Sequence, residues 1–168
     1  MTDERRTRTW SGMAPWSLAI AGILFAVTLF AAPALADGPS FGVRGGAYSE
    51  DDHPFFGAEL RFDPGAPGVW RVDPNVEHVF MDQGGLTDLS CDFHYDFWNR
   101  SALTWYTGGG PTILYRDRNQ PGESNSTNGG VNLVLGAGAK KGSTRPYGQV
   151  KVIVSQTTEA AFGLGVRF

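Results

Sequence analysis

Five polar side chains alternate along one short segment, and their types could carry out chemistry. Asp88, Ser90, Asp92, His94 and Asp96 occupy every second position, which places all five on one face of a β-strand. Carboxylates and an imidazole on a shared face could bind a metal ion or act as an acid–base cluster. Acids that are removed from water also need basic counter-ions. The alternative interpretation is therefore that this face is one part of a structural ion-pair network.

The same face holds a serine and a histidine, which are the nucleophile and the base of many hydrolases. Ser90 and His94 are four residues apart, which corresponds to about 13 Å along an extended strand. An activated serine needs its base within hydrogen-bond distance. We therefore expect no catalytic residues. Because we interpret this face as part of an ion-pair network, we also expect no metal site, and no motif indicates a cofactor.

Two loops offer weaker candidates. Glu50-Asp51-Asp52-His53 could hold a divalent cation through its carboxylates, and the alternative is a solvated acidic loop. Residues 117–128 form the longest polar connection and could bind a partner. Such a loop is also compatible with a flexible connection that has no binding role.

Eight segments of the chain alternate apolar residues with polar or small ones, and turn residues separate them. This pattern predicts an all-β protein. The third segment contains Pro74, which has no backbone N–H and should cause a local bulge. The predicted strands span residues 40–49, 55–63, 69–80, 86–98, 102–116, 129–140, 147–156 and 158–168.

The first 36 residues have the features of an export signal. Arg5, Arg6 and Arg8 precede an uncharged apolar stretch, and Ala34-Leu35-Ala36 matches a signal-peptidase site. We expect residues 1–36 to be a cleaved signal peptide and residues 37–168 to be one β-barrel domain. The stretch is also long enough to be an uncleaved transmembrane anchor.

Charge and cysteine content exclude several classes of protein. Without residues 1–36 the chain has 11 basic and 15 acidic residues, a net charge of −4. This balance does not indicate nucleic-acid binding. Cys91 is the only cysteine, so the chain has neither an intramolecular disulfide nor a metal site built on paired cysteines.

The charged residues of the predicted strands share one parity, and the apolar residues share the other. A soluble lipocalin-like barrel would line a ligand cavity with its apolar face, whereas a membrane barrel turns that face to lipid. Acids and bases are nearly balanced in the charged set, as an interior ion-pair network requires. A charge on a lipid-facing surface would cost ~2–4 kcal/mol near the bilayer midplane. The apolar face of the predicted strands carries no such charge, which favours the membrane orientation. The predicted lumen network is Arg44, Glu59, Arg61, Arg71, Asp73, Glu77, Asp88, Asp92, His94, Asp96, Lys151 and Arg167.

The segment 158–168 is predicted to close the barrel. Phe162, Leu164, Val166 and Phe168 occupy alternate positions with small or charged residues between them. In lipid the last strand must pair with the first, because an open sheet edge would leave backbone groups unsatisfied. The sequence thus predicts an eight-stranded antiparallel up-and-down transmembrane β-barrel, preceded by a signal helix, with a lumen filled by side chains.

Several segments resemble a known family. They are Asp73-Pro-Asn-Val-Glu77, Tyr106-Thr-Gly-Gly-Gly-Pro111, Gly130-Val-Asn-Leu-Val-Leu-Gly-Ala-Gly138, Arg145-Pro-Tyr147 and Phe162-Gly-Leu-Gly-Val-Arg-Phe168. This pattern resembles the outer membrane protein β-barrel domain family, the small OmpX/OmpW-like eight-stranded barrels. The resemblance implies location in the outer membrane of a Gram-negative envelope, in contact with lipid and lipopolysaccharide. It also implies insertion by the barrel-assembly machinery, which recognises the terminal strand.

We expect a monomeric structural barrel with a plugged polar lumen, which contributes to envelope integrity or surface interaction. One alternative is a soluble secreted or periplasmic barrel that binds a hydrophobic ligand. A second alternative is a lipid A-modifying enzyme, since lipid A deacylases and acyltransferases are barrels of this size. Those deacylases place His and Ser two residues apart on a lipid-facing strand, and no such pair occurs here.

Overall fold

The computed structural model describes residues 39–49, 52–62, 70–82, 84–118 and 124–168. The predicted signal peptide and cleavage site therefore lie outside the described residues. Among the residues that are described, no helix is long and apolar enough to cross a membrane. The strands are β1 (Ser40–Tyr48), β2 (Pro54–Arg61), β3 (Trp70–Met81), β4 (Gly84–Asp96), β5 (Leu103–Asp117), β6 (Ser126–Ala139), β7 (Arg145–Val154) and β8 (Thr158–Arg167).

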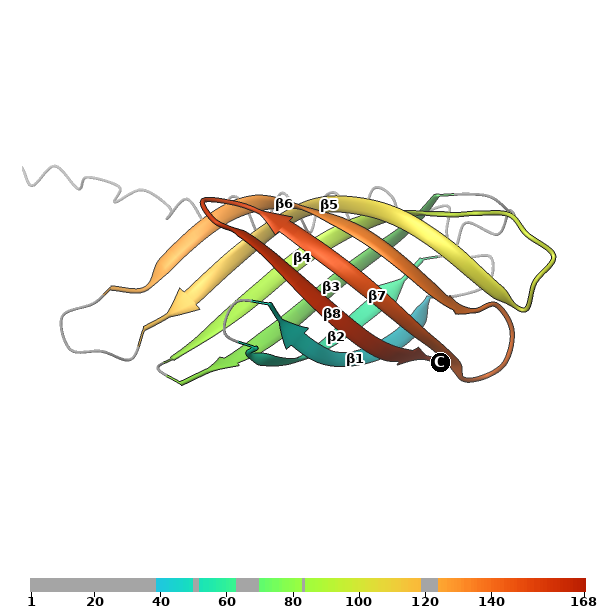
Figure 1. Ribbon diagram of the computed structural model, residues 1–168, viewed down its shortest axis with the longest axis horizontal. Helices are drawn as coiled ribbons and strands as arrows, with labels where there is room; N and C mark the ends of the chain where they lie inside the picture. The colour runs from blue at the N-terminus through green and yellow to red at the C-terminus, as the bar shows by residue number, and fades with distance from the viewer. Residues whose placement is uncertain (1–38, 50–51, 63–69, 83, 119–123) are drawn as a thin grey trace, which may run out of the picture.

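The eight strands form a closed barrel in which each strand is antiparallel to its neighbours in sequence (Figure 1). Strand β8 pairs with β1 from Gly42↔Arg167 to Tyr48↔Ala161, so the ladder has no open edge. The all-β, eight-stranded antiparallel barrel predicted from the sequence is confirmed. Strand ends differ from the predicted ones by no more than three residues.

The barrel has two ends that differ in their connections. The C-terminus lies at one end (Figure 1), where β2, β4 and β6 end and β3, β5 and β7 begin, and we call this the turn end. At the other end, which we call the loop end, β1, β3, β5 and β7 end and β2, β4, β6 and β8 begin. This arrangement follows from an even number of antiparallel strands joined in sequence order.

The bulge predicted at Pro74 is wrong. Strand β3 keeps one register with β4 along its whole length. It also keeps one register with β2, where pairing runs to Glu59↔Asn75 and resumes at Phe62↔Val72. The Val72 amide donates to Phe62, so Pro74, two residues later, faces β2 as well. Its missing N–H therefore removes one hydrogen bond from the ladder without displacing either strand.

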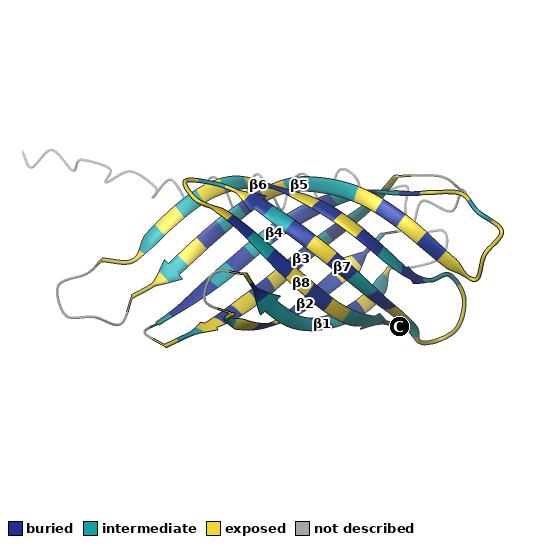
Figure 2. Ribbon diagram, in the orientation of Figure 1, coloured by how far each residue is buried: buried dark blue, intermediate teal, exposed yellow. Residues whose placement is uncertain are grey.

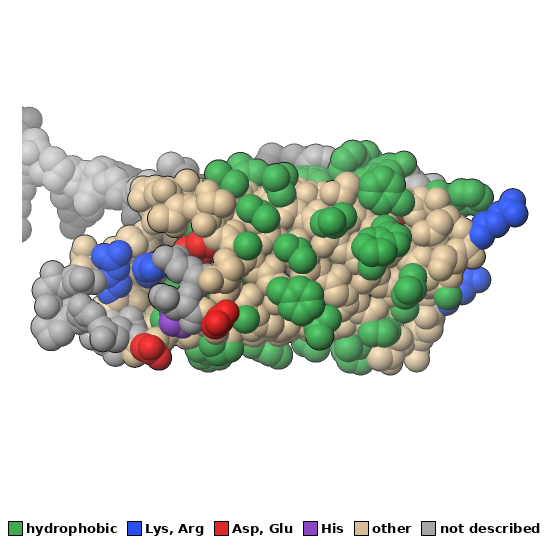
Figure 3. Space-filling view, in the orientation of Figure 1, with side chains coloured by type: hydrophobic (Ala, Val, Ile, Leu, Met, Phe, Trp, Pro, Cys, Tyr) green, Lys and Arg blue, Asp and Glu red, His purple; other side chains and the backbone are tan. Residues whose placement is uncertain are grey.

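Burial alternates along the strands, and the polar residues are the buried ones (Figure 2). Figure 3 shows hydrophobic side chains spread over the barrel wall, with charged side chains near its two ends. A soluble barrel with an apolar ligand cavity has the opposite arrangement, so that alternative is wrong. Large apolar side chains exposed on the wall include Phe56, Trp70, Phe80, Trp105, Leu133, Leu135, Phe162 and Leu164.

An apolar layer crosses the interior near the loop end. Its buried residues are contributed by seven of the eight strands, and Met81 packs against them. These residues point inward like the charged residues, so the interior consists of a charged part and an apolar part. The layer consists of Tyr48, Phe55, Val79, Leu86, Leu114, Ile153 and Ala161.

Candidate functional site

The barrel interior is the candidate site, because it gathers most of the polar residues selected from the sequence. Arg71 lies half-buried near the turn end. The structure buries the other eleven members of the predicted lumen network: Arg44, Glu59, Arg61, Asp73, Glu77, Asp88, Asp92, His94, Asp96, Lys151 and Arg167. Strand alternation explains this placement, since all of these positions share the inward parity of their strands.

Arg44 holds the centre of the network together. Its Nη1 donates to Glu59 Oε2 at 2.8 Å, and its Nε lies 2.7 Å from Glu77 Oε1. Its third contact is from Nη2 to Asn75 Oδ1 at 2.5 Å. The side chains of Arg44, Glu59 and Glu77 are fully buried. One guanidinium from β1 thus links two carboxylates from β2 and β3.

Lys151 from β7 continues the network towards the loop end. Its ammonium group forms ion pairs with Glu77 and with Asp88, the second at 2.7 Å between Nζ and Oδ2. Asp88 also accepts hydrogen bonds from Ser90 at 2.6 Å and from Thr112. These contacts join β3, β4, β5 and β7 across the lumen directly below the apolar layer.

Two inward tyrosines fill the lumen beside Arg167. The Tyr147 hydroxyl donates to Glu59 Oε2 at 2.7 Å, and Arg167 Nε donates to Glu59 Oε1 at 2.5 Å. The Arg167 guanidinium carbon lies 3.7 Å from the Tyr147 ring centroid, which is a cation–π contact. Tyr147 lies opposite Gly165 in the β7–β8 ladder, and a Cβ at Gly165 would overlap its ring.

Tyr106 occupies a similar position opposite Gly136 in the β5–β6 ladder. A Cβ at Gly136 would overlap the Tyr106 ring, and the Tyr106 hydroxyl donates to Gln149 at 3.1 Å. Inward glycines on this barrel thus provide the volume that inward tyrosines on the neighbouring strands occupy.

Asp96 forms the last ion cluster towards the turn end. Its carboxylate oxygens each accept from Arg61 Nη2 at 3.0 Å, and Oδ2 also accepts from Arg71 Nε at 2.8 Å. One acid is therefore shared by two guanidinium groups.

The alternating polar face of β4 does not assemble a catalytic group. Ser90 bonds to Asp88 and Thr112, whereas His94 Nδ1 lies 3.5 Å from Asp73 Oδ2. Neither ring nitrogen of His94 forms a hydrogen bond with a described residue, and both Asp73 carboxylate oxygens lack one as well. Ser90 and His94 thus belong to different clusters, as their spacing along the strand predicts.

Several interior residues had not been selected from the sequence. Tyr48 donates to Glu77 at 2.8 Å, and Asn75 donates from Nδ2 to Asp92 at 3.0 Å. Glu159 is buried near the loop end and lies 3.3 Å from Arg116. All three share the inward parity of their strands, but Tyr48 and Asn75 are uncharged and Glu159 lies at the start of β8, so charge in the middle of a strand does not mark them.

A polar pair on the outer wall was also missed. His78 and Thr87 face each other in the β3–β4 ladder, and His78 Nδ1 lies 3.1 Å from Thr87 Oγ1. Both project from the outer wall near the loop end. Among the described residues the polar contact of the His78 ring is with Thr87 and not with a carboxylate, so the pair lacks the acid that would orient the imidazole in a catalytic triad.

The proposed cation loop lies partly outside the described residues, which include Asp52 and His53 but not its first two positions. In the part of the chain that the structure describes, no three His, Cys, Asp or Glu side chains converge in a way that could hold a metal ion.

Comparisons with known proteins give structural matches only. No family model matches the sequence, and no curated protein matches it. Among solved structures, the N-terminal β-barrel domain of Pseudomonas aeruginosa OprF is similar, with a TM-score of 0.65 and 16% identity. That match covers 77% of this chain and 95% of the OprF domain.

Two further structures are similar. Neisserial surface protein A (NspA) matches with a TM-score of 0.58 and 12% identity, over 77% of this chain and 94% of NspA. The outer membrane enzyme PagL matches with a TM-score of 0.53 and 14% identity, over 77% of this chain and 98% of PagL. The fold is therefore that of small eight-stranded outer-membrane β-barrels. At these identities the similarity extends to the fold alone.

Proposed function

We propose that this protein is a small structural β-barrel of the bacterial outer membrane with a lumen sealed by side chains. The observation that carries the proposal is a burial pattern opposite to that of a soluble protein. Charged side chains fill the interior, and large apolar side chains such as Leu133 and Leu164 are exposed over the wall. In water such a surface would promote aggregation, whereas a bilayer solvates it.

Two successive layers of side chains along the barrel support the proposal of a sealed lumen. The ion network that runs from Asp96 to Lys151 crosses the barrel, and the apolar layer around Leu114 and Ile153 lies beyond it. Eight strands enclose an interior only wide enough for side chains. An ion that crossed the barrel would have to displace paired charges and then pass an apolar constriction.

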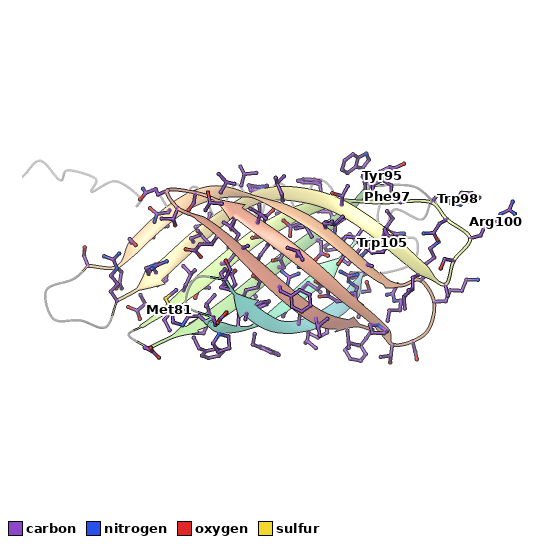
Figure 4. All side chains as sticks on the ribbon, in the orientation of Figure 1. Met81, Tyr95, Phe97, Trp98, Arg100 and Trp105 are labelled. Carbon is purple, nitrogen blue, oxygen red and sulfur yellow. The ribbon has the colours of Figure 1, made fainter. Side chains whose placement is uncertain are left out.

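The aromatic residues of the wall support a membrane orientation. Figure 4 shows Tyr95, Phe97, Trp98 and Trp105 at the turn end of the barrel, and Met81 at the opposite end. Tyr95 packs against Phe97 with ring centroids 5.5 Å apart. Aromatic residues favour the boundary between lipid and water, so this group marks one edge of the lipid-exposed band.

We place the turn end in the periplasm, as expected for a barrel whose termini share one side. In this arrangement the signal peptide directs export, and the barrel-assembly machinery recognises Phe162, Leu164, Val166 and Phe168 on the outward face of β8. The mature protein is a monomer that contacts outer-membrane lipid and lipopolysaccharide. It contributes to envelope integrity or surface interaction, and binds no nucleic acid.

Deletion of the gene in the host organism tests this role. We expect greater sensitivity to detergent and to large hydrophobic antibiotics, and restoration by the wild-type gene. A control complementation uses a variant without residues 1–36, which should stay in the cytoplasm and fail to restore the barrier. An unchanged barrier in the deletion strain, or recovery of the wild-type protein in the soluble fraction, would contradict the proposal.

A lipid A-modifying enzyme is the second candidate function. It is favoured by the polar contact between His78 and Thr87 on the outer wall, on a fold that is similar to that of the outer membrane enzyme PagL. Mass spectrometry of lipid A after overexpression separates the two functions. A change in acylation that depends on Thr87 would establish the enzyme, whereas unchanged lipid A supports the structural barrel.

A further inference from the structure

A cavity of about 290 Å³ opens at the turn end of the barrel. Among the described residues, five basic side chains and one acidic side chain line it. They are Arg61, Arg71, Lys140, Arg145, Arg167 and Asp96. The interior beyond it contains more acids than bases, so the concentration of positive charge is specific to this cavity, which we call the turn-end cavity.

The acids near this cavity do not compensate all of its bases. Asp96 is already shared by Arg61 and Arg71, and Arg167 forms its short ion pair with Glu59. Lys140 Nζ donates to two neutral oxygens of Asn99, at 2.5 and 2.6 Å.

Arg145, at the start of β7, forms no ion pair with another described residue. Lys140 follows directly after β6, so these two cations flank the β6–β7 turn and line the same cavity. Together they supply two positive charges that no carboxylate of the described residues neutralises.

Arg167 also lines the cavity, from deeper in the barrel. Arg167 is 5% exposed, and its Nη2 makes no hydrogen bond with a described residue. Asp73 Oδ2 lies 3.7 Å from this nitrogen, which is too long for a hydrogen bond. This nitrogen is itself shielded from solvent, so Arg167 adds positive charge at the inner end of the cavity and leaves direct contacts with an occupant to Lys140 and Arg145.

We propose that the turn-end cavity binds a phosphate group. Guanidinium groups match the oxygens of phosphate in bidentate geometry, and a lysine adds a mobile point charge. The two uncompensated charges equal the charge of a doubly ionised phosphate. The volume is close to the lower limit of ordinary ligand pockets, so the ligand is a small phosphate compound or the headgroup of a phospholipid. Trp98 lines the cavity and is largely exposed, which places the opening beside the aromatic edge of the wall (Figure 4).

The test is calorimetric titration of the full-length protein, purified from outer membranes in a non-ionic detergent, with inorganic phosphate at constant ionic strength. We expect saturable 1:1 binding, weakened at least tenfold by the double substitution Lys140→Gln/Arg145→Gln. The matched control is Arg100→Gln/Lys141→Gln, which removes the same charge from two exposed positions at the same end of the barrel, one in the β4–β5 connection and one in the β6–β7 turn. Its affinity should stay within twofold of the wild type. Each variant is first shown to be folded by its gel mobility without boiling.

Absence of saturable binding to the wild-type protein would overturn the proposal. Equal weakening in both double variants would also overturn it, because the effect would then be one of net charge alone. A second titration adds short-chain phosphatidylglycerol to the micelles. Loss of phosphate binding identifies the headgroup as the occupant, and unchanged binding identifies a free phosphate compound. Both of these results support the site and distinguish its source.

Discussion

Removing the Lys151 ammonium should destabilise the barrel strongly. Lys151 is 1% exposed and pairs with Glu77 and Asp88. The substitution Lys151→Met keeps most of the side-chain volume but leaves Asp88 without a cation within contact distance. Glu77 keeps its contact with Arg44. Breaking a buried ion pair by removing one partner costs about 3–5 kcal/mol, and we expect a loss of this size.

A second substitution separates the charge effect from packing. In Lys151→Met/Asp88→Leu the acid is removed as well, and a neutral apolar pair replaces the ion pair. Such replacements are close to neutral in other proteins, so most of the lost stability should return. The exposed control Lys141→Met should change stability by less than about 0.5 kcal/mol.

The assay is equilibrium unfolding by urea in lipid vesicles, followed by tryptophan fluorescence and by gel mobility without boiling. A Lys151→Met loss below about 1 kcal/mol would refute the reasoning, because Lys151 would then contribute no more than an exposed ion pair. A double variant less stable than Lys151→Met would also refute it, since the cost would then come from packing.

Three other predictions follow from the interior and the outer wall. Gly136→Val should prevent folding or strongly lower the unfolding midpoint, because the new side chain would overlap the Tyr106 ring. Gly129→Val in the same strand should be tolerated, because its side chain meets open space. Gel mobility without boiling shows whether each variant is folded. In planar bilayers the wild-type protein should show no stepwise conductance if ion pairs and the apolar layer seal the lumen, as we propose; regular steps would contradict a sealed lumen. Overexpression of the wild-type protein and of Thr87→Ala should leave lipid A acylation identical, and a difference visible by mass spectrometry would establish an enzyme.

The alternation of residue types predicted where the strands lie and which side chains point into the barrel, because side chains along any strand alternate between its two faces. The parity of Asp88 or Arg44 therefore gives the side of the wall on which it lies. Parity does not give the height of a residue along the barrel. Leu86 and Leu114 share the parity of the charged set, and the apolar layer that they form became visible only once the registers were known.

Contacts between strands were not predictable either, because parity does not give the register between two strands. The contact of His78 with Thr87 and that of Arg116 with Glu159 depend on the registers of separate strands. The effect of Pro74 also depended on the pairing, because a missing N–H produces either a bulge or a single lost hydrogen bond. The candidate residues of the turn-end cavity were individually visible in the sequence, but the closure of the barrel is what brings Arg71, Lys140 and Arg145 to one opening.

The most direct test of the central claim is the gel mobility of the protein from isolated outer membranes, with and without boiling in SDS. A barrel with an apolar wall and a paired interior should stay folded in SDS until it is heated, and should therefore migrate at two different positions. Recovery from the soluble fraction, with one mobility at both temperatures, would contradict the assignment of the apolar wall to lipid.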